Sequence, residues 1–527
     1  MTGPASATPP ASPPAAPAEA HDASHDGPGR ARFVIALTGL MMVLAMSTLD
    51  GNIVGPALPR IVSDLGGVSH LSWVMTAFLL TATITTPLYG KLSDMFGRRP
   101  LFTVAIALFL AGSILSALAT NMAMLIIGRA IQGLGGGGLM TLTQITMSDL
   151  VPPSRRASYQ GLFGAVFTGC SMIGPPLGGL ITQWLSWRWI FYVNVPVGLM
   201  GITLLWIGLS RGTASRRQRI DYGGIIVVAV ATAAALFALS LGGDVYGWTS
   251  PVILGLFIGS GLLFMALVNV ERRADNPIIE MSLFRNDIFT VATAVAALVS
   301  TAVAGAMAFV PLFLQLVLGM TPTASGLMVT PMVAALLVGM LLGGRLVTRR
   351  GRYRIFAVIG TSIAMASMTM LAVLAFLGVG AVPLIGALTG LGLGLGLTMP
   401  GITVALQNAV DPGQIGVATS TANFIRTLGS AFGVGLAGAI ITAHATSRTD
   451  RGEHAGLIAA ILDQGSEALK GSSGAAREAV IASYRHGVSL TFAACAALTI
   501  AAFLIVLFLR DKPLRTRNAP PPGTKSV

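Results

Sequence analysis

The sequence predicts an all-α polytopic membrane protein with fourteen membrane-spanning helices. Only 10% of its 527 residues are charged and 54% are hydrophobic, whereas about a quarter of the residues in a soluble domain are charged. The apolar residues form long unbroken runs, unlike the ~10-residue alternating segments of a transmembrane β-barrel. These two observations exclude a soluble enzyme.

The chain opens with a segment unlike the rest. Residues 1–31 are rich in Pro and Ala and lack an apolar core, which predicts a disordered cytoplasmic tail. The basic residues behind the net charge of +13 lie mainly in short gaps between apolar runs. We therefore expect them to set topology and contact membrane lipids rather than bind nucleic acid. Cys170 and Cys495 fall inside apolar runs, so no metal site or cofactor is expected.

Fourteen apolar runs are long enough to cross a bilayer, at about 17–25 residues each. They cover residues 33–55, 71–90, 101–119, 122–148, 159–182, 190–209, 223–241, 250–269, 288–312, 325–347, 354–376, 380–409, 416–442 and 487–509. With both tails in the cytoplasm, 24 of the 33 basic residues fall on the cytoplasmic side, seven fall outside and two fall within spans. This asymmetry satisfies the positive-inside rule.

An internal repeat divides the chain. GKLSDMFGRRP at 90–100 is echoed by GRLVTRRGRYR at 344–354, and GPPLGG at 174–179 by GVGLAG at 433–438. We expect an N-terminal six-helix bundle at 32–209 and two additional helices with cytoplasmic linkers at 210–286. A C-terminal six-helix bundle at 287–510 would include an extracytoplasmic connector at 443–486, with a cytoplasmic tail at 511–527. Such duplication places a substrate cavity between the halves and favours a rocking motion.

Several motifs then resemble one family. GKLSDMFGRR at 90–99 resembles the loop-two signature of the major facilitator superfamily and departs from it only at Met95. Together with Leu49-Asp50, Arg129-Ala130-Ile131-Gln132-Gly133, GPPLGG and the stretch 187–196, it resembles the fourteen-span drug:proton antiporter branch (EmrB/QacA type). The resemblance covers about 33–510. It implies the major facilitator fold with helices arranged 6+2+6, multidrug efflux at the inner (plasma) membrane and, as an optional partner, a periplasmic adaptor.

The loop-two motif predicts a cytoplasmic latch formed by Gly90, Asp94, Gly97, Arg98 and Arg99. Its glycines permit a tight turn. Its Asp can accept backbone N–H groups at a helix N-terminus, and its first Arg can pair with a carboxylate. The resemblance implies that this carboxylate is Asp149, and that the cluster holds the halves together in the outward-facing state. A simple topogenic turn is the alternative. Because Thr348 replaces the Asp in the second copy, we expect a one-sided latch.

Asp50 lies well inside a span, where a carboxylate is a functional candidate. It lies ~7.5 Å from the outer end of span one, and Arg129 lies ~10 Å from the same face in span four, at 1.5 Å per residue. If the two meet, motion that changes their separation or wetting changes the proton affinity of Asp50. The resemblance supports proton coupling by Asp50 and Arg129. A static ion pair is the alternative.

GPPLGG in span five resembles the antiporter signature, formed here by Gly174, Pro175, Gly178 and Gly179. The prolines remove backbone donors and bend the helix, and the glycines permit tight packing, which we expect against the other half. The resemblance implies a seal against proton leak, and a generic packing face is the alternative. Arg426 in span thirteen could contact an anionic substrate, but we expect it to be satisfied within the protein.

These features predict a secondary-active exporter, driven by protons, of small lipophilic and often cationic molecules. Export of an endogenous metabolite, antibiotic or siderophore is the main alternative. A membrane-embedded enzyme or sensor would need several convergent ionisable residues at one depth. No nucleotide-binding motif suggests ATP-driven pumping. Because spans nine to fourteen lack acidic residues, we expect divalent organic cations to be poor substrates.

Overall fold

The computed structural model describes residues 29–66, 70–210, 221–243, 245–274, 276–448 and 474–514, and in these ranges every regular element is a helix. Nearly all of the expected tail at 1–31, the centre of the connector at 443–486 and most of the tail at 511–527 lie outside the described residues.

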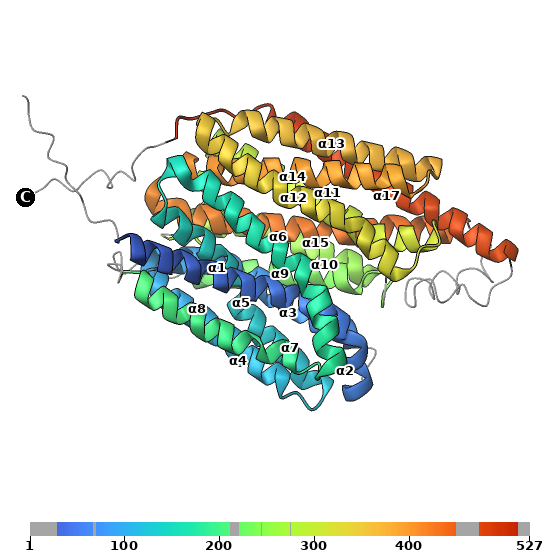
Figure 1. The fold of residues 1–527 in the computed structure, drawn as a ribbon, viewed down its shortest axis with the longest axis horizontal. Helices are drawn as coiled ribbons and strands as arrows, with labels where there is room; N and C mark the ends of the chain where they lie inside the picture. The colour runs from blue at the N-terminus through green and yellow to red at the C-terminus, as the bar shows by residue number, and fades with distance from the viewer. Residues whose placement is uncertain are drawn as a thin grey trace, which may run out of the picture.

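The long helices run along a common direction (Figure 1). Their bounds are α1 Arg30–Ile53, α3 Leu71–Phe96, α4 Arg98–Ala117, α5 Met122–Leu150, α6 Pro153–Trp184, α8 Asn194–Gly208, α9 Tyr222–Leu241, α10 Pro251–Arg273, α11 Asp287–Leu316, α12 Pro322–Arg350, α13 Arg354–Leu377, α14 Ala381–Ala409, α15 Ile415–Arg448 and α17 Gly474–Val506. The short elements are η1 Gly55–Ala57, α2 Leu58–Leu65, α7 Trp189–Tyr192, η3 Met281–Arg285 and η4 Pro412–Gln414.

Thirteen helical segments among the described residues are long and apolar enough to cross a membrane. The one described long helix outside this set is α3, with 26 residues. The described residues thus contain fourteen long helices, one for each predicted span, and thirteen of them meet the length and hydropathy expected of a membrane-spanning helix.

Of the helix boundaries that differ from the expected runs, two lie at prolines, which interrupt the backbone hydrogen bonds. The first long helix stops at Ile53, and Pro56 follows in the short η1. The run at 190–209 is split at Val193 into α7 and α8, since Pro196 has no N–H to donate to the carbonyl of Tyr192. At the other end of the chain, α17 begins 13 residues before the predicted span.

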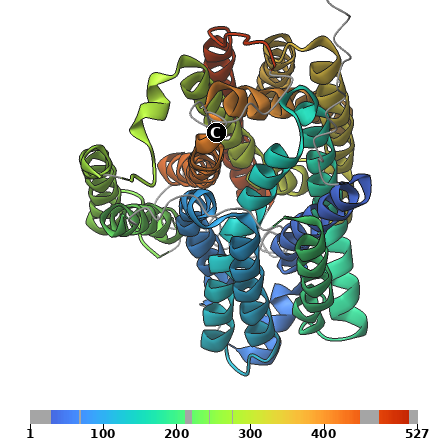
Figure 2. The same ribbon diagram turned by 90° about the vertical axis from the view of Figure 1, so that its left-hand side faces the viewer.

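The helices form two bundles with a pair beside them. In the first bundle α1, α3, α4, α5, α6 and α8 pack on one another, and in the second α11 to α15 and α17 do so. The pair α9–α10 stands to one side of both bundles (Figure 2), where α9 touches α3 and α15. This is the expected 6+2+6 arrangement.

Glycines on α5 bring three backbones close together. A Cβ on Gly135 would lie 2.6 Å from the backbone nitrogen of Phe109 in α4, and one on Gly137 would overlap the carbonyl of Ala82 in α3. Small residues permit this close approach between membrane helices. As a result α5 is held firmly inside the first bundle, and with it the polar side chains described below.

The two bundles touch at the end of the molecule where α3 turns into α4, which we call the latch end; the opposite end is the distal end. There α3 packs on α15, and α6 packs on α12. A Cβ on Gly161 of α6 would lie 2.6 Å from the carbonyl oxygen of Met340 in α12. In this conformation the two bundles are therefore held together at the latch end by the α3–α15 and α6–α12 contacts.

Candidate functional site

A buried polar network lies near the distal end of the first bundle. Arg129 Nη1 donates to Asp50 Oδ2 at 2.7 Å, and both side chains are 0% exposed. The other oxygen, Asp50 Oδ1, accepts from Gln132 Nε2 and from Asn194 Nδ2, each at 2.8 Å. The carboxylate of α1 thus accepts three hydrogen bonds from α5 and α8. The structure brings Asp50 and Arg129 into direct contact.

The sequence of α5 explains how the guanidinium is held. Arg129 and Gln132 are three residues apart and therefore share a helix face, and Arg129 Nη1 also donates to Gln132 Oε1 at 2.8 Å. The guanidinium carbon lies 4.3 Å from the centre of the Phe78 ring, a favourable cation–π distance. Because the pair is fully buried, loss of the negative charge would leave an uncompensated cation, which is strongly unfavourable.

The residues that follow Asp50 connect it to α6. A Cβ on Gly174 would lie 2.8 Å from Asn52 Cβ, and one on Gly178 would lie 3.0 Å from Ile53 Cγ1. These two glycines therefore pack on α1 of their own bundle. The expectation that they pack on the other half is wrong, because their face of α6 points toward α1.

The other motif positions in α6 behave differently. A Cβ on Gly179 would meet nothing within 4 Å, and Pro175 lies inside the helix with an exposed ring. The predicted antiporter residues are therefore one packing pair, Gly174 and Gly178, and two positions outside that contact.

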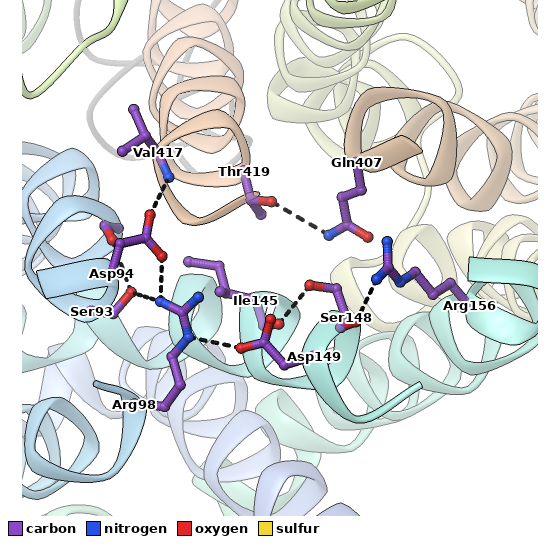
Figure 3. A network of polar contacts seen from close by, with 11 residues as sticks. Ser93, Asp94, Arg98, Ile145, Ser148, Asp149, Arg156, Gln407, Val417 and Thr419 are labelled. Carbon is purple, nitrogen blue, oxygen red and sulfur yellow. Dashed lines mark hydrogen bonds and ion pairs between the residues drawn. The ribbon is translucent and has the colours of Figure 1, made fainter. Parts of the chain in front are cut away.

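The latch residues cluster around Arg98 (Figure 3). Arg98 Nη1 donates to Asp94 Oδ1 at 2.7 Å, and its Nε donates to Asp149 Oδ2 at 2.8 Å. The second oxygen, Asp94 Oδ2, accepts from the backbone N–H of Val417 at 3.2 Å, in the first turn of α15. Both ion pairs lie within the first bundle. In this cluster, the described polar contact that reaches the second bundle is the bond from Val417 to Asp94.

The glycines of the motif serve the turn and the approach of α15. Gly97 has φ +86°, a conformation that favours glycine. A Cβ on Gly90 would lie 2.7 Å from the carbonyl oxygen of Gly416 and would overlap Ser420. The structure does not bring Arg99 into the latch. Its guanidinium instead stacks at 4.1 Å on the ring of Trp206 in α8, because adjacent helical residues point about 100° apart.

The second copy of the motif makes the corresponding contact. Thr348 Oγ1 accepts from the backbone N–H of Ser158 at 3.1 Å and from Ser158 Oγ at 2.9 Å. Thus α12 reaches α6 of the first bundle in the same way that α3 reaches α15. The expectation of a one-sided latch is wrong for the contact, since a hydroxyl replaces the carboxylate as acceptor. The expectation holds only for the negative charge, which Asp94 carries and Thr348 does not.

A cavity of about 110 Å³ lies between the bundles. Its walls come from α5, α6, α11, α12, α14 and α15, and they include Met140, Gln144, Gln160, Phe163, Phe167, Ala296, Met340, Met399, Asn423 and Arg426. Pockets for drug-sized ligands have about 300–1,000 Å³. In this conformation the cavity is therefore smaller than such a ligand, and binding one requires the bundles to move apart.

Sequence reasoning assigned no role to three buried polar residues. Gln132 follows Arg129 at helical spacing, a signal that could have placed it beside Asp50, whereas Asn194 reaches the site only through packing of α8 on α1. Glu271 is 2% exposed in the last turn of α10. The expected span ends at residue 269, which leaves Glu271 in the expected linker, whereas the structure buries it within α10 as a second buried carboxylate besides Asp50.

Comparison with known proteins now identifies the family. Residues 40–434 match the family model of the Major Facilitator Superfamily. Multidrug transporter protein MdtP of Bacillus subtilis is 38% identical over 418 residues, which cover 79% of this chain and 76% of that protein. Multidrug resistance protein 3 of the same organism is 36% identical over 416 residues, which cover 78% of this chain and 80% of that protein.

A solved structure supports the fold. The proton:xylose symporter XylE superposes with a TM-score of 0.62 over 92% of this chain and 98% of its own length, at 14% sequence identity. An identity this low bears on the fold alone. With the family match and the two related sequences, it places the chain among membrane transporters rather than enzymes. The chain belongs to the major facilitator superfamily.

Proposed function

We propose that this chain exports lipophilic small molecules in exchange for protons, by alternating access between its two bundles. The printed names of the two Bacillus relatives support drug export. The distribution of basic residues supports a plasma-membrane orientation with both termini and the latch end in the cytoplasm. The observation that carries the coupling is the fully buried Asp50–Arg129 pair.

Protonation of Asp50 is the proposed coupling event. It removes the charge that compensates Arg129 and weakens three hydrogen bonds that tie α1 to α5 and α8. Asn52 and Ile53, next along α1, pack on α6. The first half of α6 packs in turn on Met340 of the second bundle. A change in charge at Asp50 thus has a continuous packed route to the interface between the bundles.

The conformation itself supports ordered exchange. Asp50 is 1% exposed, so a proton reaches it only when the helices around it move. Tying proton access to motion prevents uncoupled leak. With the latch end closed, we assign this conformation to the outward-facing state. Release of the contacts of Val417 with Asp94 and of Ser158 with Thr348 then opens the cytoplasmic side.

Transport by reconstituted protein tests the proposal. In proteoliposomes with an imposed pH gradient, wild-type protein drives uptake of at least one compound in a fluorescent lipophilic panel that contains an anion (dansylglycine), a neutral compound (dansylamide) and a cation (ethidium). Asp50→Asn loses gradient-driven uptake of every compound that wild type moves, but it retains downhill exchange. The control Asp287→Asn removes a carboxylate that is 70% exposed, and it transports like wild type. Gradient-driven uptake by Asp50→Asn, or none by wild type, contradicts the proposal.

A further inference from the structure

The central cavity contains a cation without a described counterion. Arg426 of α15 lines it, and its Nη2 contacts Met140 Sδ at 3.8 Å. Its Nε is buried and has no hydrogen-bond partner. Among the described residues, no carboxylate lies within ion-pair distance of this guanidinium. Arg129, by contrast, is paired with Asp50 at 2.7 Å.

A second unpartnered donor lines the same cavity from the other bundle. Gln160 on α6 is 5% exposed, and its Nε2 is buried without a partner. Asn423 Nδ2, which lines the same cavity, already donates to Gln144 Oε1 at 2.8 Å. Among the described residues that line the cavity, the two buried polar atoms without a hydrogen-bond partner are Arg426 Nε and Gln160 Nε2. Both are donors, and one of them belongs to a positively charged group.

Buried unpaired donors, and charged ones above all, are costly within a membrane. A ligand that removes this cost supplies an acceptor that carries negative charge, and a guanidinium binds a carboxylate or sulfonate especially well. A cation would meet like charge, with no carboxylate among the described lining residues. Met340, Met399, Phe163 and Phe167 form the remaining, adaptable apolar wall.

We propose that this cavity binds lipophilic organic anions, with Arg426 and Gln160 as donors to the anionic group and the methionine and phenylalanine side chains around the apolar body. This inference rests on the proposed export function and names its substrate class. It replaces the expectation that substrates are often cationic and that Arg426 is satisfied within the protein.

Three fluorescent probes with one common body test the inference. Dansylglycine is an anion, dansylamide is neutral and dansylcadaverine is a cation at neutral pH. Equilibrium binding of each is measured with full-length protein in lipid nanodiscs, without any gradient. Wild type binds dansylglycine at least about tenfold more tightly than the other two, because a hydrogen bond to a charged group contributes that much or more.

Variants assign the preference to the arginine. Arg426→Gln loses the tenfold preference but still binds dansylamide, which shows that it is folded, and Arg426→Lys keeps most of the preference. Arg60→Gln removes a guanidinium that is 67% exposed and binds all three probes like wild type. Equal binding of the probes by wild type, tighter binding of dansylcadaverine, or an unchanged preference in Arg426→Gln overturns the inference.

The binding assay is independent of the export proposal. If the protein prefers the anion but shows no gradient-driven transport, the anion site is supported and the proposed function is refuted. If the protein drives transport but does not prefer the anion, the proposed function is supported and the anion site is refuted.

Discussion

The bond from Val417 N–H to Asp94 predicts how strongly one residue biases the two conformations. In Asp94→Ala the first bundle keeps the Arg98–Asp149 ion pair, so the turn between α3 and α4 stays anchored. What is lost across the interface is one hydrogen bond to a carboxylate, present at 3.2 Å. We therefore expect a shift toward the latch-open state rather than unfolding.

The magnitude follows from the charge of the acceptor. A hydrogen bond to a charged group contributes about 1.5–3 kcal/mol, which changes the closed-to-open ratio by about 10- to 150-fold. The matched variant Thr348→Ala removes the neutral copy of the contact. Ser158 N loses its acceptor at 3.1 Å, whereas Ser158 Oγ, which donates to Thr348 Oγ1 at 2.9 Å, still has the carbonyl oxygen of Gly344 at 3.4 Å as an acceptor, so one neutral bond is counted as lost. A neutral bond contributes about 0.5–1.5 kcal/mol, so the ratio changes by about 2- to 12-fold.

Spin-label distances across the latch end measure these populations. Labels on Arg155→Cys and Arg349→Cys sit on exposed positions of α6 and α12, in a background with Cys170 and Cys495 replaced by Ala. Wild type gives mainly the short label-to-label distance of the latch-closed state. Thr348→Ala shows a small fraction at the longer distance of the latch-open state, and Asp94→Ala shows a larger fraction. An Asp94→Ala distribution equal to that of wild type, or a larger shift for Thr348→Ala, refutes the reasoning.

Other predictions concern packing and substrate charge. Gly178→Ala pushes a Cβ into Ile53 and is expected to cost about 1–3 kcal/mol, seen as a lower Tm in detergent. Gly179→Ala, which meets nothing within 4 Å, keeps the Tm of wild type, so equal values for the two variants would rule out the α1–α6 contact. Divalent organic cations such as pentamidine are transported more slowly than monovalent ones, because the cavity contains Arg426 and no described acidic lining residue. Faster transport of the dication would exclude that account.

The span count and the pairing of Asp50 with Arg129 could be predicted because both depend on helix geometry along the chain. Apolar runs long enough for the bilayer define spans, and a fixed rise per residue gives the depth of a side chain. The motif alone indicated that Asp149 is a partner of Arg98 and that Asp94 accepts a backbone N–H at a helix N-terminus; the ion pair between Arg98 and Asp94 was not predicted. These features depend on residues that are close together in the sequence or on the position of a residue along its helix axis. The sequence specifies both directly.

What could not be predicted depends on rotation and on packing between distant segments. The sequence does not specify which face of α6 meets α1, so Gly174 and Gly178 were assigned to the wrong partner. Arg99 was grouped with Arg98 by adjacency, although a helix turns neighbouring side chains apart. Asn194 and Ser158 acquire their contacts only when α8 and α6 reach helices far away in the chain.

Substrate-evoked proton release tests the central claim most directly. In weakly buffered detergent solution, addition of a transported compound to wild-type protein releases protons, because a substrate that favours the ionised form of Asp50 displaces the proton bound there. Asp50→Asn binds the same compound and releases none. Proton release by Asp50→Asn equal to that of wild type would show that the coupling carboxylate lies elsewhere.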